Sequence, residues 1–283
     1  MALTFKYPTE TPTIEYVVGY ARSLLQAHSD SAKLDVELLL ARALNKDRTY
    51  LFTWHDKPVS VDELTQFEQM LTRRINGEPI AYILGQQEFW DLNLHTDPHT
   101  LIPRADTETL IEWALELAHE LPEQAAVIDL GTGTGAIALA LAKEQPRWHL
   151  QAVDVMPQAV ELAQKNASAN QLSRVKIYQS SWFDNVTGPF DLIVSNPPYI
   201  DPEDEHLSQG DVRFEPKSAL VAENNGLADL DRIARQARQY LTNGGWLLME
   251  HGYDQRDSVQ TLLRTLGYNK VSTRFDLGGN PRI

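Results

Sequence analysis

The chain has 283 residues, 42% of them hydrophobic and 23% charged, which is long enough for a full α/β core and a smaller second module. It has no run of about 18 apolar residues and no basic-then-apolar start, so neither a membrane span nor a secretory signal is expected, and the cytoplasm is the expected compartment. The lack of cysteine excludes disulfides, a thiolate nucleophile and a cysteine-based metal site, and the histidines show no metal spacing.

The net charge of −14 is unevenly distributed along the chain. Residues 1–77 hold 9 Lys and Arg against 10 Asp and Glu, a net charge of −1, so residues 78–283 carry a net charge of −13. A surface of that sign repels phosphate backbones. Direct nucleic-acid binding is therefore disfavoured, whereas a basic protein partner suits the field of the chain.

The N-terminal part, residues 1–78, is expected to be a small helical domain. Apolar residues recur at helical spacing from Ile14 to Leu25 and from Leu34 to Leu44, and a third helix is expected from Val61 to Leu71. Asn76-Gly77 is a typical helix stop. Helices of this length are not stable alone, so the pattern predicts that they pack as a bundle.

A connecting β-hairpin is expected over residues 79–104. The aromatic and partly alternating segment Glu88–His95 is followed by Asp97-Pro98-His99 and then by Leu101-Ile102-Pro103. This order indicates two short strands around a turn. The hairpin would join the helical domain to the rest of the chain.

From residue 105 to residue 283, strand and helix patterns alternate. This alternation predicts a Rossmann-like α/β domain with a mostly parallel sheet that is covered by helices on both faces. The expected strands are Ala126–Leu130, Leu150–Val153, Val175–Tyr178, Leu192–Val194 and Trp246–Met249. The expected helices are Thr107–Leu117, Ile137–Lys143, Pro157–Ser168, Leu227–Tyr240 and Asp257–Leu266.

A glycine-rich loop follows the first of these strands. Gly131, Gly133 and Gly135 precede a helix that begins near Ala136, and glycines there let the backbone turn tightly and approach a ligand. The helix N-terminus behind them offers unpaired N–H groups. Asp154, at the end of the second strand, is placed to accept hydrogen bonds from ribose hydroxyls. This loop fits NAD and S-adenosylmethionine alike.

The segment Asn196-Pro197-Pro198-Tyr199 follows the strand Leu192–Val194. In a doubly wound sheet the first and fourth strands are neighbours, so this segment and the glycine loop should flank one crevice. The Asn196 side-chain oxygen and the Pro197 carbonyl oxygen are each suited to accept one hydrogen of an NH2 group. The prolines hold these acceptors still, and Tyr199 offers a flat face against a planar group.

This arrangement predicts methyl transfer to a planar amide or amine nitrogen. An amide nitrogen is a poor nucleophile because its lone pair is delocalised into the carbonyl. Two fixed acceptors would orient its NH2 group and shift electron density onto the nitrogen. Asn196, Pro197 and Tyr199 are therefore the expected catalytic residues, and no metal is expected.

With these motifs the chain resembles the PrmC/HemK family of protein-(glutamine-N5) methyltransferases. The resemblance rests on Gly85–Phe89, Ile102–Glu108, Asp129–Gly135, Ser195–Ile200 and Gly210–Pro216. It implies transfer of a methyl group from S-adenosylmethionine to the glutamine of the Gly-Gly-Gln motif in class I peptide chain release factors. It also implies a class I methyltransferase domain with a seven-stranded sheet, and a helical domain and hairpin that help to dock the release factor. The expected form is a monomer that contacts neither nucleic acid nor a membrane.

The resemblance also assigns roles to residues of this sequence. Asp129 would lie near the amino-acid part of S-adenosylmethionine. Ser181 precedes Trp182 at a position where the family usually has Asp, and the chain ends at Ile283, where the family continues to finish a terminal strand. The implied cofactor-binding residues are Gly131, Thr132, Gly133, Thr134, Gly135, Asp154 for the ribose, Trp182 beside the adenine, and Asn196. The implied substrate-binding residues are Asn196, Pro197, Pro198 and Tyr199.

Other polar residues near these motifs have open roles. His251 and Glu250 are expected to be structural or rim residues rather than catalytic ones. Arg213 and Glu215 either contact the substrate or form an ion pair. The acidic run Asp201–Glu205 is either a solvated loop or a lid.

Two other functions stay open at this point. An adenine-N6 nucleic-acid methyltransferase shares Asn-Pro-Pro-Tyr, although the negative charge of the catalytic part argues against it. A protein that binds NAD, or a binding module without enzymatic activity, shares the glycine loop.

Overall fold

The computed structural model describes residues 5–283, and the chain divides into two compact units. One unit consists of Met1–Gly85 together with Gly210–Phe214, and the other of Gln86–Gln209 together with Glu215–Ile283. The short segment Gly210–Phe214 therefore belongs to the first unit, although the chain on either side of it belongs to the second.

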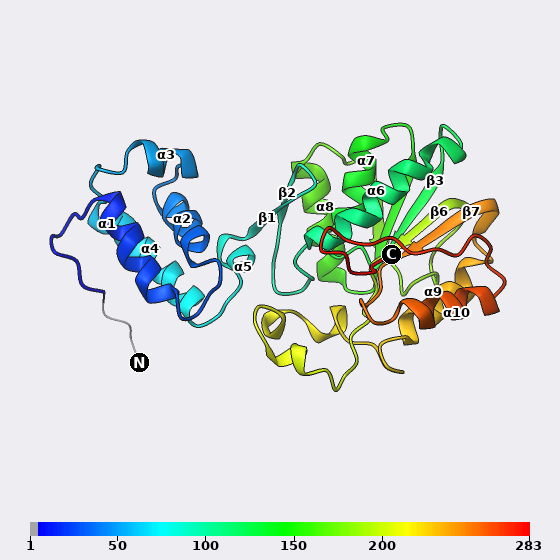
Figure 1. The fold of residues 1–283 in the computed structure, drawn as a ribbon. Helices are drawn as coiled ribbons and strands as arrows, with labels where there is room; N and C mark the ends of the chain where they lie inside the picture. The colour runs from blue at the N-terminus through cyan, green and yellow to red at the C-terminus, as the bar shows by residue number, and fades with distance from the viewer. Residues whose placement is uncertain (1–4) are drawn as a thin grey trace. The chain divides into compact units, whose positions relative to one another are not determined.

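The first unit is helical (Figure 1). Helix α1 buries Ile14, Val17, Ala21 and Leu25, a stripe with helical spacing that packs against the other helices of the unit. Three of the helices match the expected ones, and α3 and α5, of six and five residues, are additional. The helices are α1 (Ile14–Leu25), α2 (Ala32–Ala43), α3 (Arg48–Thr53), α4 (Val61–Ile75) and α5 (Ile80–Leu84).

Side-chain caps fix the beginning of several of these helices. At α4, the Ser60 hydroxyl accepts a hydrogen bond from the Glu63 amide, and the Glu63 carboxylate accepts one from the Ser60 amide. This reciprocal capping box satisfies two amides that have no partner inside the helix. At the other end the helix stops at Asn76, as the Asn76-Gly77 pair predicts.

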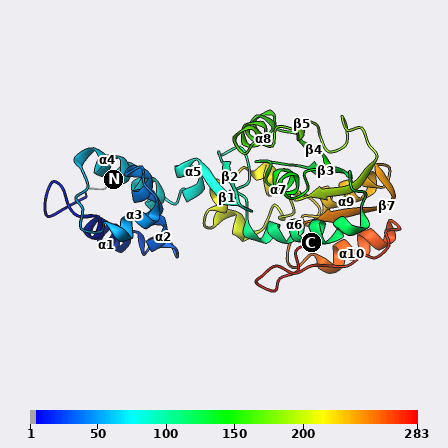
Figure 2. The ribbon, with the colours of Figure 1, turned by 90° about the horizontal axis from the view of Figure 1, so that it is seen from above.

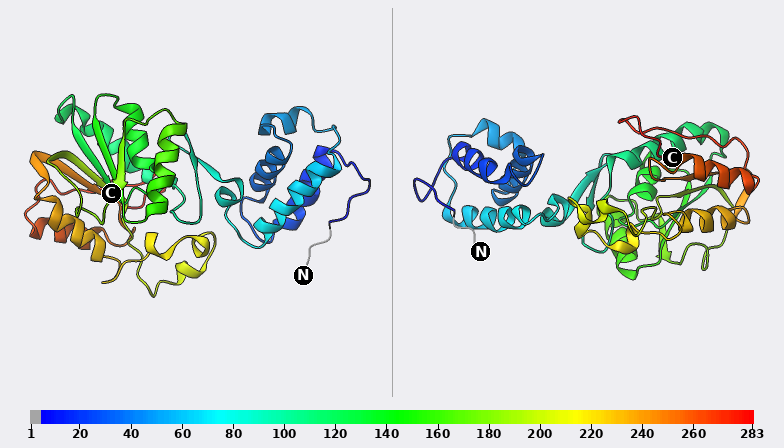
Figure 3. Two further views of the ribbon diagram at one scale, coloured as in Figure 1. Left: turned by 180° about the vertical axis from the view of Figure 1, so that it is seen from behind. Right: turned by 60° about the horizontal axis from the view of Figure 1, so that its bottom comes forward.

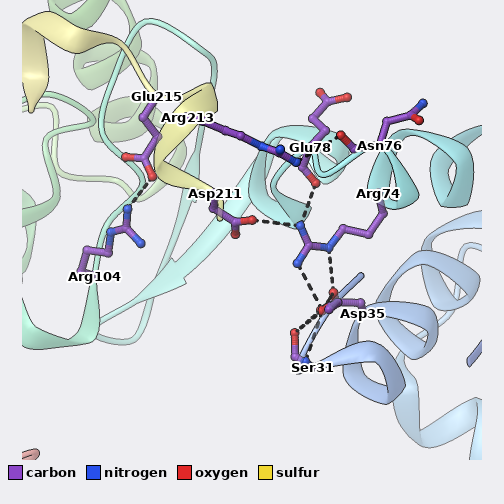
Figure 4. Close-up of polar contacts among 10 residues, drawn as sticks. Ser31, Asp35, Arg74, Asn76, Glu78, Arg104, Asp211, Arg213 and Glu215 are labelled. Atoms are coloured by element: carbon purple, nitrogen blue, oxygen red, sulfur yellow. Dashed lines mark hydrogen bonds and ion pairs between the residues drawn. The ribbon is translucent and has the colours of Figure 1, made fainter. Parts of the chain in front are cut away.

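A buried arginine joins distant parts of the first unit (Figure 4). Arg74 on α4 donates from Nε to an Asp35 oxygen at 2.7 Å and from Nη1 to an Asp211 oxygen at 2.9 Å. Asp35 lies buried on α2 and also accepts hydrogen bonds from Ser29 and Ser31. The Asp211 contact attaches the segment Gly210–Phe214 to the helices of the first unit.

A β-hairpin opens the second unit. Strands β1 (Gln86–Phe89) and β2 (Leu92–His95) are antiparallel, and Gln86 pairs with His95. The turn lies at Trp90-Asp91, with φ values of 45° and 58°, and not at Asp97-Pro98-His99. Turns of this kind favour glycine or asparagine at such angles, so the sequence gives no turn signal at Trp90.

The second unit is built on a parallel sheet of five strands in the order β5-β4-β3-β6-β7 (Figure 2). The chain runs outward from β3 in one direction and then restarts beside it with β6, so the ends of β3 and β6 form the switch point of the strand order. The strands are β3 (Ala126–Leu130), β4 (His149–Asp154), β5 (Lys176–Gln179), β6 (Phe190–Ser195) and β7 (Leu241–Met249).

Helices cover both faces of this sheet (Figure 1). Val127 of β3 packs on one side with α6, α7 and α8, and the adjacent residue Ile128 packs on the other side with α9 and α10. Successive strand residues point to opposite faces, so this strand is apolar on both. The helices are α6 (Glu108–Glu116), α7 (Ala136–Glu144), α8 (Pro157–Ala169), α9 (Ala228–Ala237) and α10 (Arg256–Thr265).

The sheet differs from the expected one in its number of strands. Within residues 5–283 the parallel sheet has five strands rather than seven. The residues after α10 instead form a loop (red in Figure 3) in which Phe275 and Pro281 make a single antiparallel bridge. Gly278-Gly279 and Pro281 favour a turn over a strand, because glycine weakens a strand and proline lacks a donor for the ladder.

No helix among the described residues is both long and apolar enough to span a lipid bilayer.

Candidate active site

Two segments leave the sheet side by side at its switch point. Leu130 is the last residue of β3 and pairs with Ser195, the last residue of β6. The buried Ser195 hydroxyl donates to the Leu130 carbonyl oxygen at 2.7 Å. Gly131 and Asn196 therefore start from adjacent, hydrogen-bonded strand ends.

Both segments line one cavity of about 250 Å³ within the second unit. Gly131–Thr134, Asp154 and Trp182 form one part of its wall, and Asn196 and Pro198 form another. The cavity thus lies beyond the carboxyl ends of the strands, where open α/β sheets bind their ligands. Gly135, Pro197 and Tyr199 lie next to the lining residues in the chain and are not part of the wall itself.

The glycine loop bends sharply over the end of β4. The amides of Gly131 and Thr132 both donate to the Val153 carbonyl oxygen at 2.9 Å. Gly131 has a φ of +72°, and a Cβ added there would lie 3.2 Å from the Trp182 ring. Gly135 has a φ of +86° and precedes α7, where a Cβ would lie 3.1 Å from Leu139. Side chains would therefore strain both positions and narrow the approach to Trp182.

Two carboxylates accept hydrogen bonds from the glycine loop. Asp129 is fully buried, and its Oδ2 accepts hydrogen bonds from the Thr132 hydroxyl at 2.6 Å and from the Ala138 amide at 3.3 Å. Burial raises the pKa of Asp129 to about 7. Asp154 accepts from the Gly133 amide and the Met156 amide, each at 2.9 Å, and burial raises its pKa as well.

The Asn-Pro-Pro-Tyr segment is held at several points. The Asn196 side-chain nitrogen donates to the Thr107 hydroxyl at 3.2 Å, and the Tyr199 hydroxyl donates to Glu250 at 3.0 Å. The Tyr199 carbonyl oxygen accepts from the Gln255 side chain at 2.8 Å. Burial raises the pKa of Tyr199, so its hydroxyl keeps its proton as a donor. The catalytic roles of Asn196, Pro197 and Tyr199 stay predictions.

Comparison with known proteins shows which family has this combination. The PrmC N-terminal domain family matches residues 17–85, and the Methyltransferase small domain family matches residues 112–214. A release factor glutamine methyltransferase from Pseudomonas aeruginosa is 54% identical over 90% of this chain and 92% of its own length. One from Aliivibrio fischeri is 51% identical over 93% of this chain and 92% of its own.

The chain belongs to the release factor glutamine methyltransferase family. It is a methyltransferase that uses S-adenosylmethionine. A solved methyltransferase from Pyrococcus furiosus has the same fold, with a TM-score of 0.52 at 19% identity over 76% of this chain and 95% of that one.

Two residues with open roles form contacts of their own (Figure 4). Glu215 accepts from the Ile102 amide at 3.3 Å and forms an ion pair with Arg104 rather than with Arg213. Arg213, in the first unit, donates to the Asn76 carbonyl oxygen at 3.4 Å and places its guanidinium over the Phe214 ring.

The sequence pattern missed several residues of this methyltransferase site. Thr107 and Asp229 line the cavity, although neither was assigned a role, whereas Ser181, which the sequence singles out beside Trp182, lines it as well. The only sequence signal for Thr107 is its place in the motif Ile102–Glu108. Glu250, expected to be structural, is 1% exposed and contacts both Thr107 and Tyr199.

Proposed function

We propose that this chain transfers the methyl group of S-adenosylmethionine to the side-chain amide nitrogen (N5) of the glutamine in the Gly-Gly-Gln motif of class I peptide chain release factors. The observation that carries the proposal is the shared cavity of the glycine loop and Asn196 at the switch point of the sheet. The names of relatives that are about half identical over nearly the full chain support the choice of substrate.

The residues of the cavity fit the methyl donor. Gly131 and Gly133 give a wall without side chains, along which a methionine moiety would lie close to the backbone. Asp129 Oδ1 is buried and has no hydrogen-bond partner among the described residues, so an acceptor remains for an ammonium group. Asp154 would accept from the ribose hydroxyls, and Trp182 would contact the adenine.

The donor supplies an electrophilic methyl group, and the residues of this chain supply the geometry. Asn196 Oδ1 and the Pro197 carbonyl oxygen would each accept one hydrogen of the glutamine NH2 group, which aims the nitrogen at the methyl group. Fixed orientation of two reactants is worth up to about 7–11 kcal/mol of the barrier. A strong base is not needed, because the proton leaves after the methyl group has transferred. Pro198 and Tyr199 would complete the site.

The other parts of the chain would support recognition of the release factor. We assign docking to the helical residues 1–78 and the hairpin linker 79–104, and transfer to residues 105–283. The acidic field of the catalytic part suits a basic protein surface and opposes nucleic acid. The enzyme would act as a cytoplasmic monomer without direct nucleic-acid contact.

The test offers tritiated S-adenosylmethionine to the enzyme together with a purified release factor or with DNA. The expected result is label in the release factor only, and tandem mass spectrometry should place the methyl group on the glutamine of Gly-Gly-Gln. A release factor in which this glutamine is replaced by glutamate is the matched control and should stay unlabelled. Label found only in DNA would favour the adenine-N6 alternative.

A further inference from the structure

Glu250 is a buried acid beside the Asn-Pro-Pro-Tyr segment. It follows β7 directly, and its amide donates to the Ser195 carbonyl oxygen at 3.0 Å, one residue before Asn196. Only 1% of the residue is exposed. Burying a carboxylate costs free energy unless its oxygens are hydrogen-bonded. The hydrogen-bond partners of Glu250 therefore indicate the role of this side chain.

Each oxygen of Glu250 accepts one hydroxyl. Oε2 accepts from the Thr107 hydroxyl at 2.6 Å, and Oε1 accepts from the Tyr199 hydroxyl at 3.0 Å. Burial raises the pKa of Glu250, and the two hydrogen bonds together with the charge of Arg282 oppose that rise. Arg282 is held nearby by ion pairs to Asp106 and Asp276.

The contact to Thr107 decides how Asn196 is oriented. A threonine hydroxyl has one hydrogen, and Thr107 gives it to Glu250, so its oxygen is left as an acceptor. The Asn196 group that faces it must therefore be the NH2 group, and the observed distance between Nδ2 and the hydroxyl oxygen is 3.2 Å. The Asn196 carbonyl oxygen is then the atom left to accept a hydrogen bond from a substrate.

We propose that Glu250 and Thr107 are positioning residues that orient the Asn196 amide, with its oxygen toward the substrate NH2 group. We call the hydrogen bonds from Asn196 to Thr107 and from Thr107 to Glu250 the relay. Without the relay, the Asn196 amide is free to rotate, and its NH2 group could face the substrate NH2 group. Two donors would then lie opposite each other with no acceptor between them. The Glu250 carboxylate also accepts the Tyr199 hydroxyl. One buried acid therefore orients both ends of the Asn-Pro-Pro-Tyr segment. The inference rests on the proposed function, since it concerns the acceptor for a substrate NH2 group.

The test is a double-mutant cycle between Thr107 and Asn196. Thr107→Val keeps the shape and removes the hydroxyl, and we expect it to lower kcat about 10²-fold with little change in the KM for the methyl donor. Thr107→Ser restores the hydroxyl and should recover most of the turnover. In an Asn196→Ala background, Thr107→Val should change single-turnover rates by no more than about twofold, because its effect passes through Asn196.

A merely structural role gives a different outcome. If Thr107→Val lowers the rate by the same factor with and without the Asn196 side chain, the relay is wrong. Glu250→Leu should lower kcat at least as much as Thr107→Val, because it also removes the acceptor of the Tyr199 hydroxyl, and adding Thr107→Val to it should have little further effect. Melting temperatures accompany each variant, and if Glu250→Leu does not fold, the Thr107 cycle alone decides. Thr261→Val, which removes an exposed hydroxyl from α10, is the control and should change neither rate nor stability.

A second measurement needs no release factor. In the ¹⁵N-labelled enzyme, the Asn196 side-chain NH2 signal, assigned by its loss in Asn196→Ala, should exchange slowly with solvent in the parent and in Thr107→Ser. It should exchange fast in Thr107→Val. Equal exchange in all three would overturn the relay. An enzyme that shows this pattern yet fails to methylate release factor would refute the proposed function and leave the relay intact.

Discussion

The glycine loop Gly131–Gly135 and the segment Asn196–Tyr199 leave neighbouring strands, yet they are held in different ways. The loop is held from its own strand and the next one: Asp129 is 3 residues from Thr132, and Asp154 at the end of β4 is 21 residues from Gly133. The second segment is held from far away: Thr107 is 89 residues from Asn196, and Glu250 is 51 residues from Tyr199.

This difference separates two tasks. In the proposed function, the glycine loop and Asp154 bind the methyl donor, which is the same in every reaction cycle, so a loop supported by its own and the adjacent strand is sufficient for this task. Orientation of an unreactive amide depends on which side-chain atom faces it, and that requires supports from several elements. Changes in the loop should therefore affect cofactor affinity, and changes around Asn196 should affect turnover.

The largest expected effect is that of Asn196→Ala. Removal of the acceptor oxygen should lower kcat by about 10³-fold, the cost of losing one fixed hydrogen-bonding group in a site of this kind. The affinity for S-adenosylhomocysteine, measured by calorimetry, should stay largely intact. The matched control is Asn269→Ala, in the exposed loop after α10 and outside the segments assigned to docking. Turnover equal to that of the parent would contradict the role of this side chain.

Gly226→Ala should displace the backbone at Tyr199. Gly226 has a φ of +76°, and a Cβ there would lie 2.0 Å from the Tyr199 carbonyl oxygen, so backbone must shift. We expect a loss of about 2–4 kcal/mol in the free energy of unfolding, together with lower turnover. Urea unfolding measures the first quantity. Gly19→Ala on the open face of α1 is the control and should add up to about 1 kcal/mol of stability.

Asp154→Asn tests whether the glycine loop and its supports govern the affinity for the cofactor. The amide has one acceptor atom where the carboxylate has two, so it cannot serve both the Gly133 and the Met156 amides and a ribose. We expect binding of S-adenosylhomocysteine to weaken by roughly 10- to 100-fold. At saturating methyl donor, kcat should change far less than in Asn196→Ala. The reverse pattern, in which the affinity for S-adenosylhomocysteine is kept and kcat is lost, would contradict the separation of cofactor binding from amide orientation.

The last prediction concerns neither affinity nor turnover but the pH dependence of stability through Asp129. Its pKa rises from 3.8 to about 7 on folding, so the folded state binds more protons than the unfolded state between these values. The free energy of unfolding should therefore fall as pH rises through this window, by on the order of 1 kcal/mol for each pKa unit of the shift. Asp129→Asn should flatten that slope in urea titrations. An identical slope in both proteins would mean that Asp129 is already ionised at low pH.

Much of the fold follows from local patterns, and the exceptions have local causes. Strand β3 has the predicted bounds, Ala126–Leu130, because a short apolar run ends at a glycine. Strand β7 begins at Leu241, five residues before the expected start, because Gly244-Gly245 hides its first part and the pairing with β6 is irregular there. Helices α3 and α5 are too short for a periodic pattern to show.

The site divides in the same way. The glycine loop and Asn196 are visible in the sequence because each motif is contiguous and follows a strand. The relay through Thr107 is not visible, since its Glu250 partner lies 143 residues away and only folding brings them together. The need for glycine at position 226 is likewise visible only in the folded chain, where this residue lies against the Tyr199 carbonyl oxygen.

The most direct measurement is a crystal structure of the enzyme with S-adenosylhomocysteine and a release factor. We expect the glutamine amide nitrogen to lie about 3 Å from both Asn196 Oδ1 and the Pro197 carbonyl oxygen, with the cofactor on the glycine loop. We also expect Asn196 Nδ2 still to donate to Thr107. A glutamine bound elsewhere, or one whose amide faces the Asn196 NH2 group, would contradict both the proposed function and the role of Thr107.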